Sequence, residues 1–202
     1  MNKKVIGFIV TIFVVVIGIT AWFLLTSENS SSTEERKQSI NGNVSENKNV
    51  AIVYFSATGN TKMVAQYIQE KTGGTLFGIE PEEEYTDRDL DYNNDDCRAN
   101  EEQNDPSVRP GIENTIDLSS YDIVYLGYPI WWGDVPKIIL TFLDETDLSG
   151  KTVIPFCTSG GSGIETSLDT LKNYNSDIDW IDGERLSTSK ADVTDWLNGL
   201  KY

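Results

Sequence analysis

The sequence predicts an α/β protein: a doubly wound, five-stranded parallel sheet between two layers of helices, preceded by one transmembrane helix. Three observations predict it. Residues 5–25 form an uncharged apolar run, and residues 27–48 are polar. From Asn49 onward, apolar segments of strand length alternate with segments of helical period. The 202 residues therefore give room for one ordinary domain and an additional segment.

Residues 5–25 are long enough to cross a bilayer, whose apolar core of about 30 Å needs about 20 helical residues. A cleaved signal peptide is the alternative, but its apolar region has only about 7–15 residues and ends in small side chains. Lys3 and Lys4 precede the run, so the positive-inside rule predicts a cytoplasmic N-terminus and an extracytoplasmic remainder. We expect residues 1–26 to anchor the chain in the cell membrane; secretion after signal cleavage is the alternative.

Residues 27–48 are rich in Ser, Glu and Asn and contain few large apolar side chains. A segment of this composition cannot bury enough surface to offset the entropy lost on ordering. We expect a disordered tether here, followed by one domain over residues 49–202.

The domain alternates strands and helices. Five apolar segments predict the strands: residues 50–55, 75–79, 121–128, 151–157 and 178–181. Four segments predict helices: residues 61–72, a segment that begins at Pro136, a segment after Gly163, and a segment capped by Ser189 and Asp192. An irregular acidic stretch separates the second strand from the third. Ligands bind such sheets beyond the carboxyl ends of the strands, so the loops after strands one, three and four are the candidate site.

The loop after the first strand is rich in hydrogen-bond donors. Hydroxyl groups, a side-chain amide and successive backbone N–H groups converge at a helix N-terminus, which favours an anion such as a phosphate. The loop lacks the spacing of a P-loop or of a dinucleotide-binding turn. A capped strand-to-helix turn without a ligand is the structural alternative. The residues are Ser56, Ala57, Thr58, Gly59, Asn60 and Thr61.

The loop after strand three contributes two tryptophans to the candidate site, and the loop after strand four contributes glycines. Two consecutive indoles can stack on a conjugated ring, and we expect one to pack in the core and the other to be available to a ligand. Glycines allow backbone to approach a planar ligand closely. The residues of the first of these loops are Pro129, Ile130, Trp131, Trp132 and Gly133, and those of the second are Thr158, Ser159, Gly160 and Gly161.

Three motifs in order resemble a known family. The segment YFSATGNTKMVA resembles the phosphate-binding loop of flavodoxins, and YPIWWGDVP and FCTSGGSGI resemble the two other flavin-contacting loops of flavodoxin-like proteins. The resemblance covers residues 49–202. It implies flavin mononucleotide (FMN) as cofactor, with its phosphate held by Ser56–Thr61 and its ring flanked by Pro129–Gly133 and Thr158–Gly161. Trp131 or Trp132, and an aromatic side chain such as Tyr85, are candidates to cover the ring faces.

Composition excludes several other classes. The formal net charge of −16 argues against a nucleic-acid partner, and the absence of histidine excludes Ser-His-Asp or Cys-His catalysis. Two cysteines cannot form a four-cysteine metal centre; we expect Cys157 to be a small buried side chain, while a disulfide to Cys97 stays open. A calcium-loop pattern beginning at Asp87 fails because Tyr92 and Arg98 occupy its most restrictive positions. We therefore expect no metal.

Residues 80–105 contain twelve Asp and Glu residues against two arginines. Nearby carboxylates disfavour the negatively charged, reduced form of a flavin, so we expect this segment to make the protein a stronger reductant. The same charge would repel anionic nicotinamide cofactors and attract basic partner proteins.

These observations favour an electron carrier tethered to the outer face of the cell membrane, with redox proteins or quinones as partners. An FMN-dependent NAD(P)H:quinone-type oxidoreductase is the first alternative, since a membrane anchor would place the flavin beside quinones. Against it, the sequence has no G-x-G-x-x-G turn for a second nucleotide. A module that binds flavin without cycling it is the second alternative.

Overall fold

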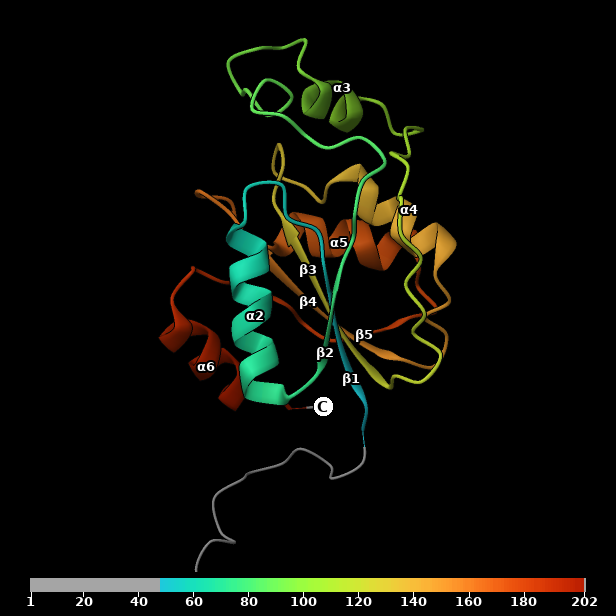
Figure 1. The fold of residues 1–202 in the computed structure, drawn as a ribbon, viewed down its shortest axis with the longest axis vertical. Helices are drawn as coiled ribbons and strands as arrows, with labels where there is room; N and C mark the ends of the chain where they lie inside the picture. Colours follow the sequence, from blue (N-terminus) through green and yellow to red (C-terminus); the bar gives the residue numbers. More distant parts are fainter. Residues whose placement is uncertain (1–47, 202) are drawn as a thin grey trace, which may run out of the picture. The chain divides into compact units, whose positions relative to one another are not determined.

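The structure is a computed structural model that describes residues 48–201. Figure 1 shows a sheet between helices. The strands are β1 (Val50–Tyr54), β2 (Thr75–Gly78), β3 (Ile123–Pro129), β4 (Thr152–Thr158), β5 (Asp179–Trp180) and β6 (Glu184–Arg185). The helices are α2 (Asn60–Thr72), α3 (Arg98–Asn104), α4 (Lys137–Glu145), α5 (Glu165–Tyr174) and α6 (Lys190–Gly199).

All strand pairs of the sheet are parallel, and the order is β2-β1-β3-β4-β5, with β6 also paired to β4. Helices α2 and α6 cover one face, and α4 and α5 cover the other (Figure 1). The predicted three-layer, doubly wound architecture is confirmed for the described residues. The chain runs outward in opposite directions from β1 and β3, so the switch point of the strand order lies between these two strands.

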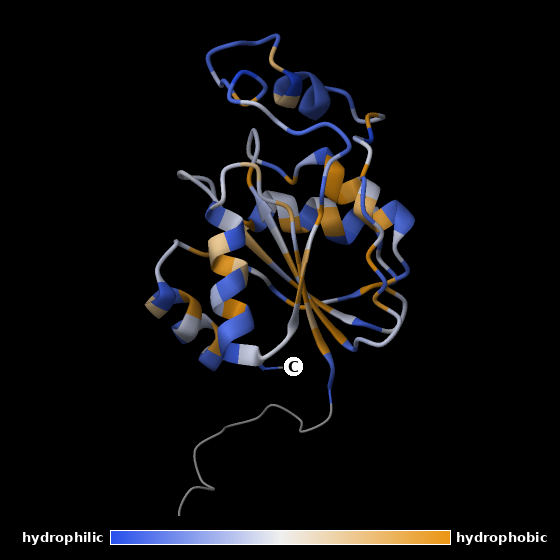
Figure 2. Cartoon of the chain, in the orientation of Figure 1, coloured by the Kyte–Doolittle hydropathy of each residue, from blue (hydrophilic) through white to orange (hydrophobic). Residues whose placement is uncertain are grey.

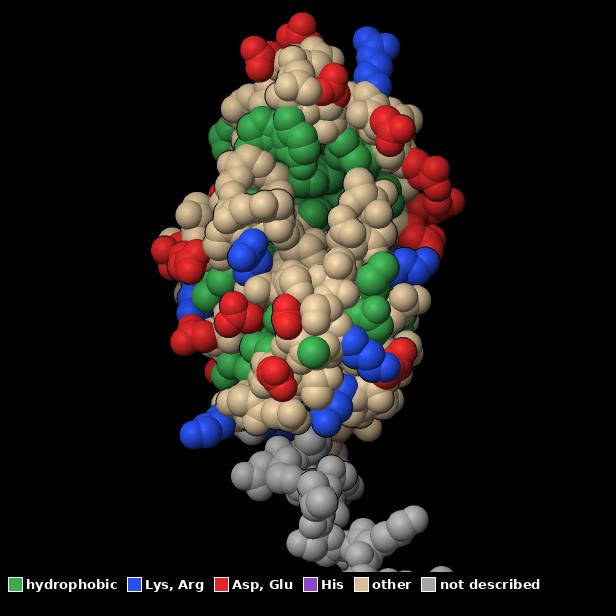
Figure 3. All heavy atoms as spheres, turned by 90° about the vertical axis from the view of Figure 1, so that its left-hand side faces the viewer, with side chains coloured by type: hydrophobic (Ala, Val, Ile, Leu, Met, Phe, Trp, Pro, Cys, Tyr) green, Lys and Arg blue, Asp and Glu red, His purple; other side chains and the backbone are tan. Residues whose placement is uncertain are grey.

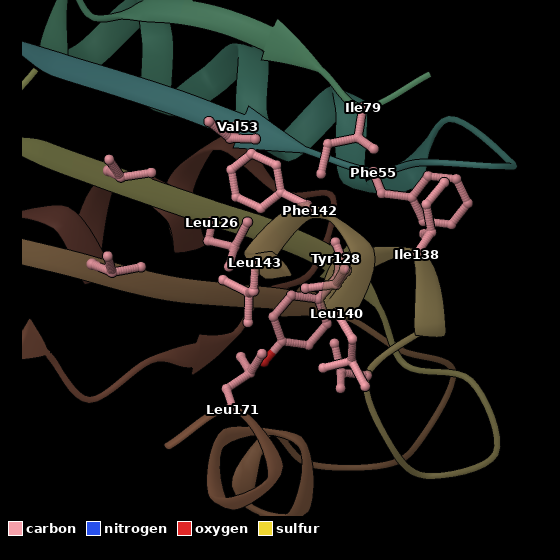
Figure 4. Close-up of a cluster of buried hydrophobic side chains, with 14 of the residues drawn as sticks. Val53, Phe55, Ile79, Leu126, Tyr128, Ile138, Leu140, Phe142, Leu143 and Leu171 are labelled. Atoms are coloured by element: carbon pink, nitrogen blue, oxygen red, sulfur yellow. The ribbon is translucent and has the colours of Figure 1, made fainter. Parts of the chain in front are cut away.

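The central strands are hydrophobic on both faces, which explains their continuous apolar sequences (Figure 2). Alternate residues point to opposite sides: Ile52 and Tyr125 face α2 and α6, whereas Val53 and Leu126 face α4 and α5. Figure 4 shows this second core, where side chains of β1 and β3 meet those of α4 and Leu171 of α5. The two cores hold the strand ends rigidly beneath the loops.

The acidic stretch is not irregular throughout, as the sequence suggested, because it contains helix α3. Its seven residues include one buried apolar side chain, Ala99, so the segment has no apolar stripe that could reveal a helix. An ion pair between Arg98 and Glu102, one turn apart, supports it instead. The domain therefore has five helices in its described part rather than the four predicted.

The predicted fifth strand, residues 178–181, is confirmed as β5, but the strand beside β4 is split there and continues as β6, which was not predicted. The carbonyls of Val153 and Cys157 on β4 accept hydrogen bonds from the chain on either side of the split. The residue between them on that edge is Pro155, which has no N–H to donate. Opposite it, a Cβ on Gly183 would lie 2.4 Å from the Pro155 carbonyl oxygen. The split follows from a proline inside β4.

The prediction of a membrane anchor at residues 1–26 lies outside the described residues, as does the prediction of a tether at residues 27–48 apart from Lys48. Between residues 48 and 201, no helix has the length and apolar character needed to cross a membrane. Cys97 and Cys157 are buried and free, so no disulfide joins them.

Candidate functional site

The three predicted loops meet at the carboxyl edge of the sheet, around the switch point between β1 and β3. The hydroxyl of Thr61 on α2 lies 2.8 Å from that of Thr158, which ends β4, in a buried hydrogen bond. The Ile130 N–H donates to the Thr158 carbonyl over 2.9 Å, and the Phe55 N–H donates to the Gly127 carbonyl over the same distance. Segments far apart in the sequence thus form one continuous rim.

The loop after β1 presents free hydrogen-bond donors. Gly59 has a φ of 88°, a left-handed conformation that favours glycine, and it starts α2 without a side-chain cap. The backbone N–H groups of Asn60, Thr61 and Lys62 find no acceptor within the described part of the chain. The Ser56 hydroxyl accepts from the Gly59 N–H, and this leaves its own proton free to donate. This arrangement is what an anion requires.

The two indoles of the loop after β3 have opposite environments. Trp131 is 4% exposed and packs edge-on against Phe55, with ring centroids 5.4 Å apart. Trp132 is 39% exposed and has a φ of 47°, unusual for a bulky side chain. Trp131 and Asp134 exchange backbone hydrogen bonds across Trp132 and Gly133, which form a tight turn. The expectation of one core indole and one accessible indole is confirmed, and Trp132 is the accessible one.

The loop after β4 is open. Ser159 is half-buried and accepts a hydrogen bond from the Gly161 N–H, while Gly160 and Gly161 are exposed. A Cβ on either glycine would meet no atom within 4 Å, and neither has a positive φ. The packing of the chain itself does not require glycine at these positions. Without side chains at these positions, a flat ligand could approach the backbone closely.

A second aromatic contact comes from the acidic segment. The Tyr85 ring packs against Trp131 with centroids 4.9 Å apart, and its hydroxyl donates to Glu102 over 2.7 Å. The Arg98 guanidinium lies over the same ring, 4.1 Å from its centroid. Burial, followed by the hydrogen bond to Glu102, raises the pKa of Tyr85 above its ordinary value. Tyr85 is thus a fixed, neutral part of the rim.

The role of α3 in this rim was missed by sequence reasoning. Gln103 donates to the Trp131 and Val135 carbonyls over 3.0 and 3.3 Å. Tyr92, from the loop before α3, lies against Trp132 with ring centroids 5.2 Å apart. Both contacts join residues far apart in sequence, and the sequence pointed to this region only through Tyr85 as a candidate ring cover and through the charge of residues 80–105.

Figure 3 shows a hollow lined by hydrophobic side chains in the upper part of the molecule, between ridges of polar atoms and below several Asp and Glu side chains. This face carries α2, whose N-terminus points upward, and the acidic segment lies above it (Figure 1). Trp132 and Tyr92 are two of the four large hydrophobic side chains that are exposed in the described residues. The site therefore combines an anion cradle with an apolar surface.

The Cys157 thiol, near the end of β4, is not activated as a nucleophile. Burial raises the pKa of the Cys157 thiol to about 12, so this side chain stays protonated at neutral pH. Within residues 48–201, no group of three or more His, Cys, Asp or Glu side chains could hold a metal ion.

Comparisons with known proteins agree with the fold. The sequence pattern of the flavodoxin family matches residues 49–200. A search of curated proteins finds no match. Among solved structures, a protein from Bacteroides eggerthii that is proposed to be a flavoprotein is 42% identical, with a TM-score of 0.72, and the alignment covers 77% of this chain and 100% of that one.

Two further structures are similar. A protein from Bacteroides uniformis, also proposed to be a flavoprotein, is 37% identical with a TM-score of 0.73, over 76% of this chain and 99% of that one. A Lactobacillus acidophilus flavoprotein, solved in complex with FMN, is 25% identical with a TM-score of 0.59, over 75% of this chain and 99% of that one.

Proposed function

The chain belongs to the flavodoxin family, and from this premise we propose that it binds FMN at the carboxyl edge of the sheet and carries electrons on it. One observation carries the proposal: backbone donors at the start of α2, which have no acceptor among residues 48–201, lie on the same rim as an accessible indole and an open glycine loop. The backbone donors suit the phosphate of FMN, and the indole and the glycine loop suit its ring. The Lactobacillus flavoprotein in complex with FMN supports the choice of cofactor.

The phosphate of FMN would lie at the start of α2. The N–H groups of Asn60, Thr61 and Lys62 and the hydroxyls of Ser56 and Thr58 supply donors. A helix N-terminus favours a dianion, and these donors are neutral. The cradle accepts the phosphate although residues 49–202 hold 28 acidic and only 11 basic side chains.

The ring of FMN would lie between the other two loops. The Trp132 indole offers a flat face, and the backbone at Gly160 and Gly161 can approach the polar ring edge without steric hindrance. Thr158 is buried at the base of the site and holds Thr61 in place. When bound, FMN supplies one-electron and two-electron transfer, while the residues of the chain bind it, orient it and exclude water from one side.

The proposal is tested by titrating the full chain with FMN and with riboflavin, which lacks the phosphate. We expect FMN to bind more tightly, and Ser56→Ala/Thr58→Ala to weaken FMN binding while leaving riboflavin binding unchanged. Ser149→Ala, at the opposite edge of the sheet, is the control. A chain that binds neither compound would refute the assignment of the site.

Electron transfer needs a separate test, because binding alone is also compatible with a non-redox module. Potentiometric titration of the FMN-loaded chain should show full, reversible reduction. Steady-state turnover with reduced nicotinamide and a quinone distinguishes a carrier from an oxidoreductase, and a carrier shows little turnover. A flavin that cannot be reduced reversibly in the protein would contradict electron transport.

We propose, further, that residues 1–26 tether the domain to the outer face of the cell membrane, where redox proteins or quinones would be its partners. Support comes from the uncharged run at residues 5–25 and from Lys3 and Lys4 before it. Reporters fused to the C-terminus, one active only outside the cytoplasm and one only inside, test the orientation. Membrane fractionation separates an anchored chain from a secreted one.

A further inference from the structure

Gln103 on α3 holds both ends of the aromatic turn after β3. Its side-chain amide donates to the carbonyl of Trp131, which precedes the turn, and to that of Val135, which follows it, over 3.0 and 3.3 Å. These two residues enclose Trp132, the accessible indole. One side chain from a helix about thirty positions earlier in the chain therefore fixes the turn at both ends.

The turn needs external support. Trp132 is the one non-glycine residue with a positive φ among the described residues, and such a conformation persists only where the surroundings impose it. On the other side, Asp134 accepts a hydrogen bond from Thr170 of α5 over 2.9 Å. The turn is held between α3 and α5, and Gln103 is the α3 contact.

Gln103 makes these contacts at a cost. Its Oε1 is the one buried side-chain oxygen or nitrogen without a hydrogen-bond partner in the described part of the molecule. An apolar residue would avoid this cost but could not donate to the two carbonyls. The neighbouring residue, Glu102, accepts hydrogen bonds from Tyr85, whose ring packs against Trp131, and from Arg98 of the same helix. The two donor contacts to the carbonyls on either side of the turn are therefore the distinctive contribution of the glutamine.

We propose that Gln103 is a positioning residue for the flavin ring: it holds the Trp132 indole in its place, and so sets the affinity for the ring and the reduction potential. This inference rests on the proposed function, because it assigns the ring to the side of Trp132. If Gln103 has this role, the acidic segment contributes to the binding site directly, through α3, and not only through its negative charge.

The first test needs no flavin. The full chain is labelled with 5-fluorotryptophan, and the Trp132 resonance is the one absent from Trp132→Phe. Gln103→Met keeps the length of the side chain and removes both donors, so we expect the Trp132 resonance to shift or broaden. Gln66→Met is the matched control, since Gln66 is exposed on α2 and makes no side-chain hydrogen bond in the described residues.

The second test asks whether the substitution of Gln103 affects binding of the flavin ring or of the phosphate. In Gln103→Met we expect FMN and riboflavin to lose affinity by the same factor, at least about fivefold, because binding then has to order the turn that the two hydrogen bonds held. An effect on the phosphate end would appear with FMN alone. The reduction potential of bound FMN should shift in Gln103→Met and stay at the wild-type value in Gln66→Met.

Three results would overturn the inference: an unchanged Trp132 resonance, a loss confined to FMN, or an unaltered potential. Thermal unfolding of the flavin-free variants controls for folding. If Gln103→Met unfolds before it can be measured, Gln103→Asn, whose shorter amide cannot span both carbonyls, takes its place with the same expectations. Failure of wild-type protein to bind any flavin would instead refute the proposed function, while the resonance test would still decide whether Gln103 orders the turn.

Discussion

At the residue scale, the site depends on two adjacent indoles with different roles. Trp131 closes the core against Phe55 and Tyr85, and Trp132 lies in a left-handed turn with part of its surface exposed. A bulky residue with positive φ costs of order 1 kcal/mol or more. The protein tolerates this cost at the rim of the proposed site, where the exposed indole would offer its face to the flavin ring.

Replacing Trp132 separates stability from binding. Asparagine accepts a left-handed conformation more readily, so Trp132→Asn should leave the stability of the flavin-free protein unchanged or raise it by up to about 1 kcal/mol. Affinity for FMN should fall, because the aromatic face is lost. Chemical denaturation and flavin titration measure the two effects. Destabilisation by more than about 2 kcal/mol would mean that Trp132 serves the fold instead.

The thiol of Cys157 gives a pH prediction. Burial raises its pKa from 9.0 to about 12, so the folded state favours the protonated form. This group contributes full stability below pH 9 and loses that contribution as the pH rises from 9 through 12. In a Cys97→Ala background at pH 9, alkylation of the folded protein should be slower than that of the unfolded chain by about a hundredfold or more. Similar rates would contradict the burial of this thiol.

At the scale of elements, the site is assembled by contacts between strand ends and helix starts. The Thr61–Thr158 hydrogen bond joins the start of α2 to the end of β4, and Gln103 joins α3 to the turn after β3. These contacts bring together the phosphate side and the ring side of the proposed site. A double-mutant cycle can measure the first of them.

Thr158→Val should destabilise the flavin-free protein by about 1–3 kcal/mol, because the Thr61 hydroxyl would be left buried without a partner. Thr61→Val should have a similar effect for the same reason. The double variant should recover much of the loss, since both hydroxyls are then gone. Denaturant unfolding measures all four proteins. Strictly additive losses would show that the two hydroxyls do not interact.

Most elements could be predicted because the strands of the doubly wound sheet are buried on both faces and therefore read as apolar runs, as in β1 and β3. The choice of the three site loops followed from the rule that ligands bind beyond the carboxyl ends of the strands in such sheets. Helix α3 could not be predicted, since Arg98, Glu102 and Gln103 hold it through polar contacts to residues outside the helix. The break between β5 and β6 also depends on a tertiary contact, that of Gly183 with Pro155. Sequence alone did not distinguish Trp131 from Trp132.

At the scale of the whole molecule, charge is the dominant property. Residues 49–202 hold 28 acidic against 11 basic side chains, and twelve of the acidic ones lie in residues 80–105, which fold over the proposed site (Figure 1). Added negative charge on a bound flavin would be repelled by this field. The protein should therefore be a stronger reductant than free FMN.

Salt tests this effect. The Debye length falls from about 30 Å at 0.01 M to about 10 Å at 0.1 M, so added salt should raise the potential of the final reduction step by on the order of tens of mV. Glu82→Gln/Glu83→Gln/Glu84→Gln should reduce this dependence. Spectroelectrochemical titration at several ionic strengths measures it. A final potential at or above that of free FMN, at low salt, would contradict the role given to the acidic segment.

The central claim is that the three loops form an FMN site. The most direct measurement is the absorption spectrum of the purified full chain, with the released chromophore identified by chromatography. The claim predicts a flavin spectrum and release of FMN, or restoration of that spectrum when FMN is added to colourless protein. A colourless protein that does not bind added FMN would contradict it.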